Sequence, residues 1–472
     1  MEQSSKILAY VEETFNEKKC RDLCHRYKFI KRSSSKLQGH EFVKVMICPS
    51  PELAIDSLKG LCKRLLDFNP KAKLTAQSLS EKVNHASASE LMRGVFLELV
   101  LKIDQAITEK CAVCEPMLKH FNRVTIQDST QITLNEKLEA IFKGTNRGGC
   151  SGKAQVKIDI IHNLSTGKTI NAKLFQGNEP DQGHAERILE FIQPNDLVIR
   201  DLGYFALNSL RKISEMNAYF ITRLKSNTKF YLKETDKIPL DVSWHLQHDI
   251  FKDLNIIEID GFLGEEKVPG RLVIYRQSEE VTRARLRIAN ENARQSGREM
   301  SKGKKFLLQF TAFFTNAPKE LLSAEIIGTI YRLRWEIELI FKRWKGQLQI
   351  DYLKGINPER IKCLIWSRLC SALIIELING VFKNIVWRLY KIELSTVKLI
   401  QYLKRCNQFC NAIAKGTLVL FFAQMEKDLP KMLLKDKRKR RTMRERVLKK
   451  ESYYAIPLIN DEISLLMNQE AA

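Results

Sequence analysis

The sequence has no run of apolar residues long enough to cross a lipid bilayer. Its most apolar stretch, residues 369–382, is shorter than the roughly 20 residues that a spanning helix needs, and Glu376 interrupts it. The N-terminus lacks the charged, then apolar, then small-residue pattern of a secretory signal peptide. We therefore expect a cytoplasmic protein that does not enter a membrane, with residues 369–382 in a buried helix.

The cysteines of this sequence do not have the spacing that a zinc site needs. Eleven cysteines in an unexported chain of 472 residues indicate reduced thiols rather than a disulfide framework. Cys111 and Cys114 form one CxxC pair without a second at zinc-finger spacing, and the spacings of this pair and of Cys20 and Cys24 also place two thiols on one helix face. We therefore expect packing rather than metal binding at both pairs. The glycine-rich stretch 146–152 fits neither the Walker nor the dinucleotide pattern, so we expect a hairpin loop there.

Acidic residues are too few to balance the basic ones. The chain has 78 Lys and Arg against 55 Asp and Glu, a formal net charge of +23. This charge indicates a polyanionic partner, with nucleic acid as the first candidate and an anionic membrane surface as the second. Basic residues are spread along the whole chain, which favours a long DNA path. An apolar fraction of 44% and this length predict a globular protein of two or three domains.

The N-terminal region, residues 1–118, is predicted to be a helical domain. Within it, residues 74–83 and 86–107 form two helices around a tight polar break. This arrangement resembles a helix-turn-helix, whose second helix could enter a major groove of DNA. Any helical hairpin has the same pattern, so packing without DNA contact is the alternative.

From residue 119 the pattern becomes α/β. Three strands in a meander, followed by helix, strand, helix and strand, have the order of a ribonuclease-H-like (retroviral-integrase-like) core. We assign this catalytic core to residues 119–350, with a β-rich insertion at 225–321 and a helical, basic region at 351–472 that contains the cationic run 435–446. The predicted strands are 124–128, 154–162, 169–175, 196–200 and 218–224, and the predicted helices are 184–191 and 204–216.

Residues 331–345, YRLRWEIELIFKRWK, are predicted to form one amphipathic helix. At about 100° per residue, the apolar side chains gather on one stripe, and Glu336 lies away from the polar stripe beside it. A single carboxylate among cations on a rigid helix fits a site that holds a metal ion together with a phosphate backbone. An ordinary charged helix is the alternative interpretation. The polar stripe carries Tyr331, Arg334, Glu338, Lys342 and Lys345.

The spacing Tyr-x2-Arg-x3-Glu-x6-Lys in this helix resembles the signature of bacterial DDE transposases of the insertion-sequence-four type, the branch that includes the transposase of transposon Tn-five. The resemblance covers roughly residues 120–350. It implies that Glu338 is catalytic and that Tyr331, Arg334 and Lys345 hold phosphates near the cleavage site, Arg334 in a bidentate manner and Lys345 as a point charge. It also implies that the N-terminal region recognises the ends of the element.

Two aspartates complete the expected DDE triad with Glu338. Asp128 is predicted at the end of the first strand and Asp201 just beyond the fourth, and their contexts, Asp-Ser-Thr and Asp-Leu-Gly-Tyr, resemble those of the family. All three would bind Mg²⁺, for which Mn²⁺ can substitute. Each aspartate alone could instead be a turn or cap residue. The competing carboxylates are Asp159, Asp181 and Asp196.

The resemblance implies cut-and-paste transposition on double-stranded DNA. Water attacks the element's end, the freed 3′-hydroxyl forms a hairpin that is later reopened, and the end is then joined to target DNA. The family also implies a homodimer that bridges two terminal inverted repeats. A structure-specific nuclease on the same fold and a DNA-binding repressor with an inactive catalytic domain are the alternatives.

Overall fold

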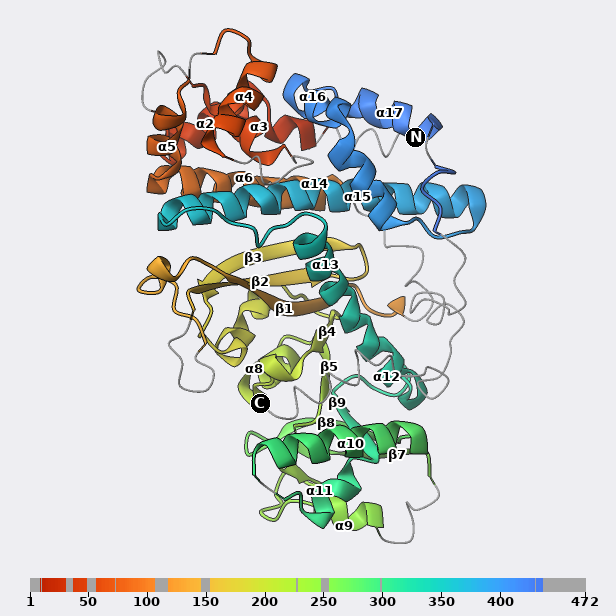
Figure 1. Cartoon of the computed structure of the whole chain (residues 1–472). Helices are drawn as coiled ribbons and strands as arrows, with labels where there is room; N and C mark the ends of the chain where they lie inside the picture. Colours follow the sequence, from red (N-terminus) through yellow and green to blue (C-terminus); the bar gives the residue numbers. More distant parts are fainter. Residues whose placement is uncertain are drawn as a thin grey trace.

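The computed structural model describes residues 9, 11–30, 37–48, 57–72, 74–106, 118–145, 153–225, 228–247, 254–297, 299–428 and 430–435. The CxxC pair at Cys111 and Cys114, the glycine-rich stretch 146–152 and the basic run beyond Lys435 lie outside these ranges. Within them the fold is mixed α/β, with one large sheet beneath a layer of helices (Figure 1).

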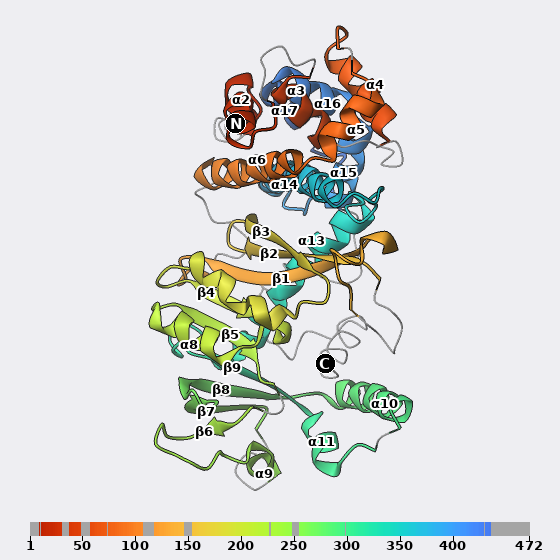
Figure 2. The ribbon, with the colours of Figure 1, turned by 90° about the vertical axis from the view of Figure 1, so that its left-hand side faces the viewer.

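The described strands form a nine-stranded sheet in the order β3-β2-β1-β4-β5-β9-β8-β7-β6. β1, β4 and β5 are parallel, whereas β2 and β3 are added antiparallel beyond β1. Figure 2 shows the strands stacked from β3, next to the helices, down to β6. The first five strands are β1 (Val124–Thr133), β2 (Gln155–Asn163), β3 (Lys168–Gln176), β4 (Leu197–Arg200) and β5 (Tyr219–Arg223).

Three local predictions need correction. β1 continues to Thr133, so Asp128 lies inside the strand and not at its end. The reason is that the antiparallel partner β2 pairs with β1 as far as Thr133, whereas pairing with the parallel β4 stops at Ile126. The predicted helix 184–191 is a 3₁₀ helix, η3 (Asp181–Glu190), and the predicted helix 204–216 is divided into η4 (Leu202–Tyr204) and α8 (Leu207–Glu215).

The predicted insertion extends the sheet. β9 (Phe310–Thr315) pairs antiparallel with β5 on one side and with β8 (Val268–Arg276) on the other, so backbone hydrogen bonds run from the core strands into the inserted ones. α12 (Ala324–Tyr331) follows β9 closely, which places the residues after the insertion next to the sheet. The remaining elements are β6 (Phe230–Tyr231), α9 (Val242–Gln247), β7 (Ile256–Leu263), α10 (Glu279–Gln295) and α11 (Lys302–Leu307).

The N-terminal and C-terminal helices pack together in one layer. α6 (Ala86–Ala106) and α14 (Pro358–Tyr390) lie along each other over the β3 edge of the sheet in both views (Figures 1 and 2), and Phe96 meets Trp366 with ring centroids 5.2 Å apart. The second helix of the predicted helix-turn-helix therefore packs against α14. The other helices of this layer are α2 (Glu17–Arg26), α3 (Gly39–Ile47), α4 (Leu58–Phe68), α5 (Ala76–Val83), α15 (Thr396–Arg405), α16 (Asn407–Lys415) and α17 (Leu418–Asp428).

The apolar stretch 369–382 lies in α14, and most of its side chains are buried, as predicted. Among the described helices, none combines the length and apolar character that a membrane span requires. The described cysteines are free thiols; Cys20 and Cys24 are buried on α2, and burial raises the pKa of each, to about 12 and about 11 respectively. These two cysteines therefore pack in the core as neutral thiols.

The predicted amphipathic helix is present but is not one regular helix. α12 is followed by a 3₁₀ turn, η6 (Arg332–Arg334), and then by α13 (Trp335–Gly346), which crosses one face of the sheet (Figure 1). The 3₁₀ turn brings Arg332 and Arg334 into buried positions. The predicted core stripe is confirmed, because all of its members are buried: Leu333, Ile337, Ile340, Phe341, Trp344 and Leu348.

His162 on β2 provides a test of how the sheet packs against α14. Its ring is buried near Glu376 and Lys383 of α14 and Arg343 of α13, and burial lowers its pKa from 6.5 to about 4. The unfolded chain therefore binds a proton at a higher pH than the folded protein does. We expect the free energy of unfolding to fall by on the order of 3 kcal/mol as the pH drops from about 6.5 to about 4.

Urea unfolding at several pH values would measure this dependence. The variant His162→Gln should lose this component of the acid destabilisation, whereas His120→Gln, at an exposed histidine, should keep the parent's pH dependence. Identical pH dependence in His162→Gln and the parent would show that His162 is not buried as a neutral ring.

Candidate active site

Three carboxylates from three separate elements face one another at the edge where the parallel strands end. Asp128 lies on β1, two residues beyond Ile126, the last residue of β1 that pairs with β4. Asp201 directly follows β4, and its side chain accepts a hydrogen bond from the backbone N–H of Gly203 at 3.2 Å. Glu338 lies in the first turn of α13. The fold thus brings together the three residues of the predicted triad.

Strand alternation decides which face each carboxylate occupies. Side chains two residues apart on a strand share a face, so Asp128 lies on the same face as Ile126, which packs with α13 in the larger core. Gln127 and Ser129 point to the opposite face. Asp159 is the cross-strand partner of Ser129, so it shares that opposite face. The register of β1 against β2 therefore places Asp128 and the competing carboxylate Asp159 on opposite faces of the sheet.

The guanidinium of Arg334 lies between the three carboxylates and pairs with all of them. Its Nη2 is 2.6 Å from Glu338 Oε1, its Nε is 3.3 Å from Asp201 Oδ1, and its Nη1 is 3.5 Å from Asp128 Oδ2. The carboxylate side chains of Asp128, Asp201 and Glu338 retain 15%, 10% and 15% of their exposure, respectively. The cluster is therefore mostly enclosed but still reaches the surface.

Burial and charge act against each other in this cluster. Burial raises the pKa of Asp128 well above its usual value, and the nearby Asp201 adds to this effect, while Arg334 opposes it. Burial also raises the pKa of Glu338, again opposed by Arg334. For Arg334, burial alone lowers the pKa, but the charges around it, with Asp201 first, raise the pKa above its usual value. Arg334 is therefore a permanent cation in an acidic cluster.

The other two polar residues of the signature occupy protein-bound positions. The phenol of Tyr331 is buried, and burial together with Asp201 raises its pKa. The described part of the chain offers its hydroxyl no hydrogen-bond partner. Lys345 Nζ donates to the carbonyl oxygen of Gln131 on β1 at 2.8 Å, and burial lowers its pKa. Lys345 therefore ties α13 to the strand that carries Asp128.

Two of the competing carboxylates have structural partners instead. Asp159 is fully buried and accepts hydrogen bonds from the Tyr204 hydroxyl at 2.8 Å and from Gln127 Nε2 at 3.0 Å, and it also pairs with Arg187. Asp196 precedes β4 and pairs with Arg123 at 2.6 Å, at the end of the strand opposite Asp201. Neither carboxylate joins the cluster around Arg334.

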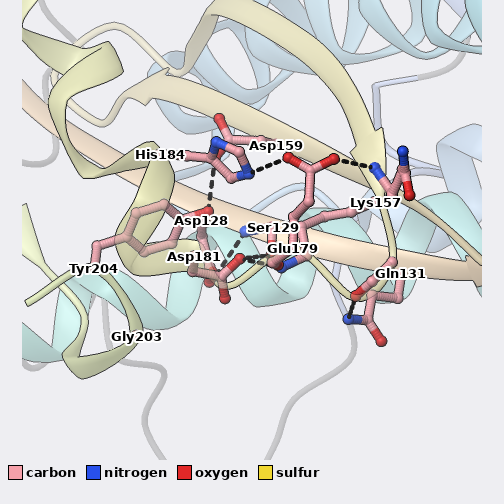
Figure 3. Close-up of polar contacts among 12 residues, drawn as sticks. Asp128, Ser129, Gln131, Lys157, Asp159, Glu179, Asp181, His184, Gly203 and Tyr204 are labelled. Carbon is pink, nitrogen blue, oxygen red and sulfur yellow. Dashed lines mark hydrogen bonds and ion pairs between the residues drawn. The ribbon is translucent and has the colours of Figure 1, made fainter. Parts of the chain in front are cut away.

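The third competitor, Asp181, lies much nearer to the cluster than its place in a predicted loop indicated. Its Oδ1 accepts hydrogen bonds from the Ser129 hydroxyl at 2.9 Å and from Lys157 Nζ at 2.7 Å (Figure 3). Asp181 and Asp201 both lie beside Gly203. A Cβ atom added at Gly203 would be 3.4 Å from Asp181 Oδ2 and 3.5 Å from Asp201 Oδ2, which is van der Waals contact. Asp181 thus holds Ser129, whose backbone N–H in turn donates to Asp128 Oδ1 at 2.8 Å.

Sequence reasoning did not identify this support for Asp128. Ser129 on β1 and Lys157 on β2 are polar residues on the same face of the sheet, and strand alternation could have indicated this. No local pattern in the sequence places Asp181 beside them. The contact depends on η3 folding back over the sheet, and that packing is not encoded in a short window of sequence.

The donor chemistry of the cluster fits a hard divalent cation. Carboxylate oxygens are the ligands that Mg²⁺ prefers, and the position of the guanidinium shows that the space between them accepts a positive charge. Among the residues that the structure describes, no three Asp, Glu, His or Cys side chains lie close enough together to hold one ion. Binding one ion by all three carboxylates therefore requires Arg334 to move out from between them.

Comparison with known proteins identifies the family of the chain. The family model of the transposase DDE domain matches residues 119–374, more than half of the chain. The chain is 29% identical over 405 residues to the transposase for insertion sequence element IS231F of Bacillus thuringiensis subsp. israelensis, a match that covers 83% of this chain and 82% of that protein. It is 24% identical over 415 residues to the transposase for IS1151 of Clostridium perfringens, covering 84% and 86%.

A solved structure, the piggyBac transposase synaptic complex with hairpin DNA, aligns with a TM-score of 0.44 at 10% identity, covering 93% of this chain and 86% of that one. The family match and the insertion-sequence relatives establish the identity. The chain belongs to the DDE transposase family and is a metal-dependent transposase of an insertion sequence, which cleaves DNA and transfers strands.

Proposed function

We propose that Asp128, Asp201 and Glu338 are the catalytic DDE triad and that they bind Mg²⁺, for which Mn²⁺ can substitute. The observation that supports this proposal is the convergence of the three carboxylates on one guanidinium, although they come from β1, the end of β4 and α13. Bound magnesium ions would stabilise the charge on the attacking and leaving oxygens of the phosphoryl transfer. The proposal makes the core strands β1 to β5 a ribonuclease-H-like domain, which their order supports.

Backbone and side-chain groups around the triad set its geometry. The backbone N–H of Ser129 orients Asp128, the backbone N–H of Gly203 orients Asp201, and Lys345 holds α13 against β1 so that Glu338 faces both aspartates. Catalytic carboxylates work only when they are fixed close to the reactive geometry, so these contacts matter for rate.

We further propose that this chain is of the insertion-sequence-four type and that its Tyr-Arg-Glu-Lys helix contacts the phosphates next to the cleaved bond. Arg334 and Tyr331 are three residues apart and both face the triad, so a phosphate near the triad would be within reach of both. Lys345 would have to exchange its bond with Gln131 for a phosphate, or else act by holding the helix in place.

The substrate would be double-stranded DNA, first at the terminal inverted repeats and then at the target. The helical N-terminal region, residues 1–118, would recognise the element ends, and a homodimer would hold two ends together. The net charge of +23 supports a long contact with the DNA backbone. Cleavage would pass through a DNA hairpin, as in the resembled branch.

A cleavage assay with a labelled duplex tests this function. The duplex should carry the candidate element end, taken from inverted repeats in the DNA that flanks the gene. With Mg²⁺ we expect nicking at the end, a hairpin product and, after target DNA is added, joined strands; a chelator should remove all three.

Each product excludes a different alternative. Cleavage without joined strands in any target DNA would favour a nuclease, and binding without cleavage in both Mg²⁺ and Mn²⁺ would favour a repressor. Nicking and joining without a hairpin would contradict the insertion-sequence-four assignment but keep the transposase function.

A further inference from the structure

We propose that Arg334 is a displaceable internal cation that closes the carboxylate site to divalent metal ions until a DNA phosphodiester draws it away. Metal loading would then depend on bound DNA. This inference rests on the proposed catalytic role of the three carboxylates. It assigns Arg334 a second role besides phosphate contact, namely control of access to the site.

The first support is the way in which Arg334 fills the cluster. It uses a different nitrogen atom for each carboxylate, so one planar group bridges Asp128, Asp201 and Glu338. A divalent ion would need the same oxygen atoms, and two cations cannot share them without strong repulsion. Because the guanidinium cannot lose its charge, it can leave the oxygens only by moving.

The second support is the backbone around Arg334. It is the last residue of the 3₁₀ turn η6, which lies between the regular helices α12 and α13. A 3₁₀ turn within a longer helical run often marks a hinge, because its hydrogen bonds are less favourable than those of an α-helix. A change in this one turn would shift Arg334 relative to the triad without unfolding either helix.

The third support comes from Tyr331, at the N-terminal side of the same turn. Its hydroxyl is buried beside Asp201, and it has no hydrogen-bond partner in the described part of the chain. A buried hydroxyl normally has a partner, so this one indicates a ligand that brings an acceptor oxygen. A phosphodiester offers several such oxygens and could accept from both Tyr331 and Arg334. The same ligand would therefore satisfy the hydroxyl and attract the guanidinium.

Manganese binding to the full-length protein tests the proposal. Metal ions are first removed from the protein with a chelator, and Mn²⁺ binding is then measured by electron paramagnetic resonance. Without DNA, Arg334→Gln should bind Mn²⁺ at least about fivefold more tightly than the parent, the lower end of ordinary site coupling. Lys342→Gln removes the same charge from the exposed side of α13, near Glu338 but outside the cluster, so its affinity should stay close to the parent's. Equal affinities of Arg334→Gln and the parent would overturn the proposal.

Adding the element-end duplex completes the test without relying on a variant. In the parent the duplex should raise the Mn²⁺ affinity by at least about fivefold, whereas in Arg334→Gln it should add little. No change in the parent would overturn the proposal even if Arg334→Gln failed to fold. Sodium sulfate at the same ionic strength, in place of DNA, should have no such effect; an equal rise would show that any oxyanion suffices and would overturn the dependence on DNA.

Two further variants separate this inference from the proposed function. Asp128→Asn and Glu338→Gln should weaken Mn²⁺ binding if the triad holds the metal ion. If neither weakens it, the proposed triad is wrong. If both weaken it but Arg334→Gln binds no more tightly than the parent, the triad stands and the role of Arg334 in closing the site is wrong.

Discussion

Glu338→Gln is expected to abolish cleavage of an element end while the protein still binds the DNA. The substitution keeps the shape of the side chain but removes its negative charge. In the structure this charge pairs with Arg334, which also contacts Asp128 and Asp201. Losing a residue that only supports a metal ligand already costs about 10–100-fold, so losing a proposed ligand should reduce the cleavage rate by more than about 100-fold. Single-turnover cleavage in Mg²⁺, with DNA binding measured by gel shift, gives both quantities.

Glu336→Gln is the matched control for this variant. Glu336 lies in the same first turn of α13 and is half-buried, yet sequence analysis and structure both keep it out of the cluster around Arg334. Its loss should leave the cleavage rate within a few-fold of the parent's. Equal loss of cleavage in both variants would mean that the charge of the helix, and not the position of Glu338, supports the reaction.

Asp159→Ala is expected to destabilise the fold more than any other single aspartate discussed above. Its carboxylate is fully buried and pairs with Arg187, and it also accepts a hydrogen bond from Tyr204. Removing it leaves the Arg187 guanidinium without its carboxylate partner and the buried Tyr204 hydroxyl without its acceptor. Breaking a buried ion pair from one side typically costs about 3–5 kcal/mol, and we expect a loss of that size in the free energy of unfolding.

Chemical denaturation followed by circular dichroism would measure this change. Asp260→Ala provides the comparison. The Asp260 side chain is 75% exposed, and its ion pair with Lys319 is long, at 3.8 Å. Such a surface pair should contribute less than about 1 kcal/mol to the free energy of unfolding. A stable Asp159→Ala variant with no cleavage activity would contradict the structural role and return Asp159 to the list of candidate catalytic residues.

Local patterns in the sequence were sufficient for the elements that depend on neighbours along the chain. The alternation of residues 154–162 and 169–175 predicted β2 and β3 to within one residue at each end. The core stripe of the helix at 331–345 followed from its period, because side-chain direction repeats with the backbone geometry. The composition and the four-residue signature were also enough to predict a transposase, which the family match confirms.

The three-dimensional contacts were decided by pairing between distant segments. The register of β1 against β2 turned Asp159 away from α13 and Asp128 toward it, and nothing in either strand alone states that register. The 3₁₀ turn at Arg332–Arg334 departs from the regular wheel and places both arginines in buried positions. The packing of α6 against α14 likewise brings together segments more than 250 residues apart in the sequence, as the contact between Phe96 and Trp366 shows.

The sequence by itself therefore determined the family, the approximate strands and the identity of the carboxylates to consider, since these depend on residue type and short-range spacing. Only the tertiary structure decided that Asp128, Asp201 and Glu338 meet around Arg334, that Asp181 supports Asp128 through Ser129, and that Asp159 belongs to the buried framework. The physical reason is that a charged side chain takes its partners from whatever the folded chain brings within a few ångströms, and strand register and helix packing set those distances.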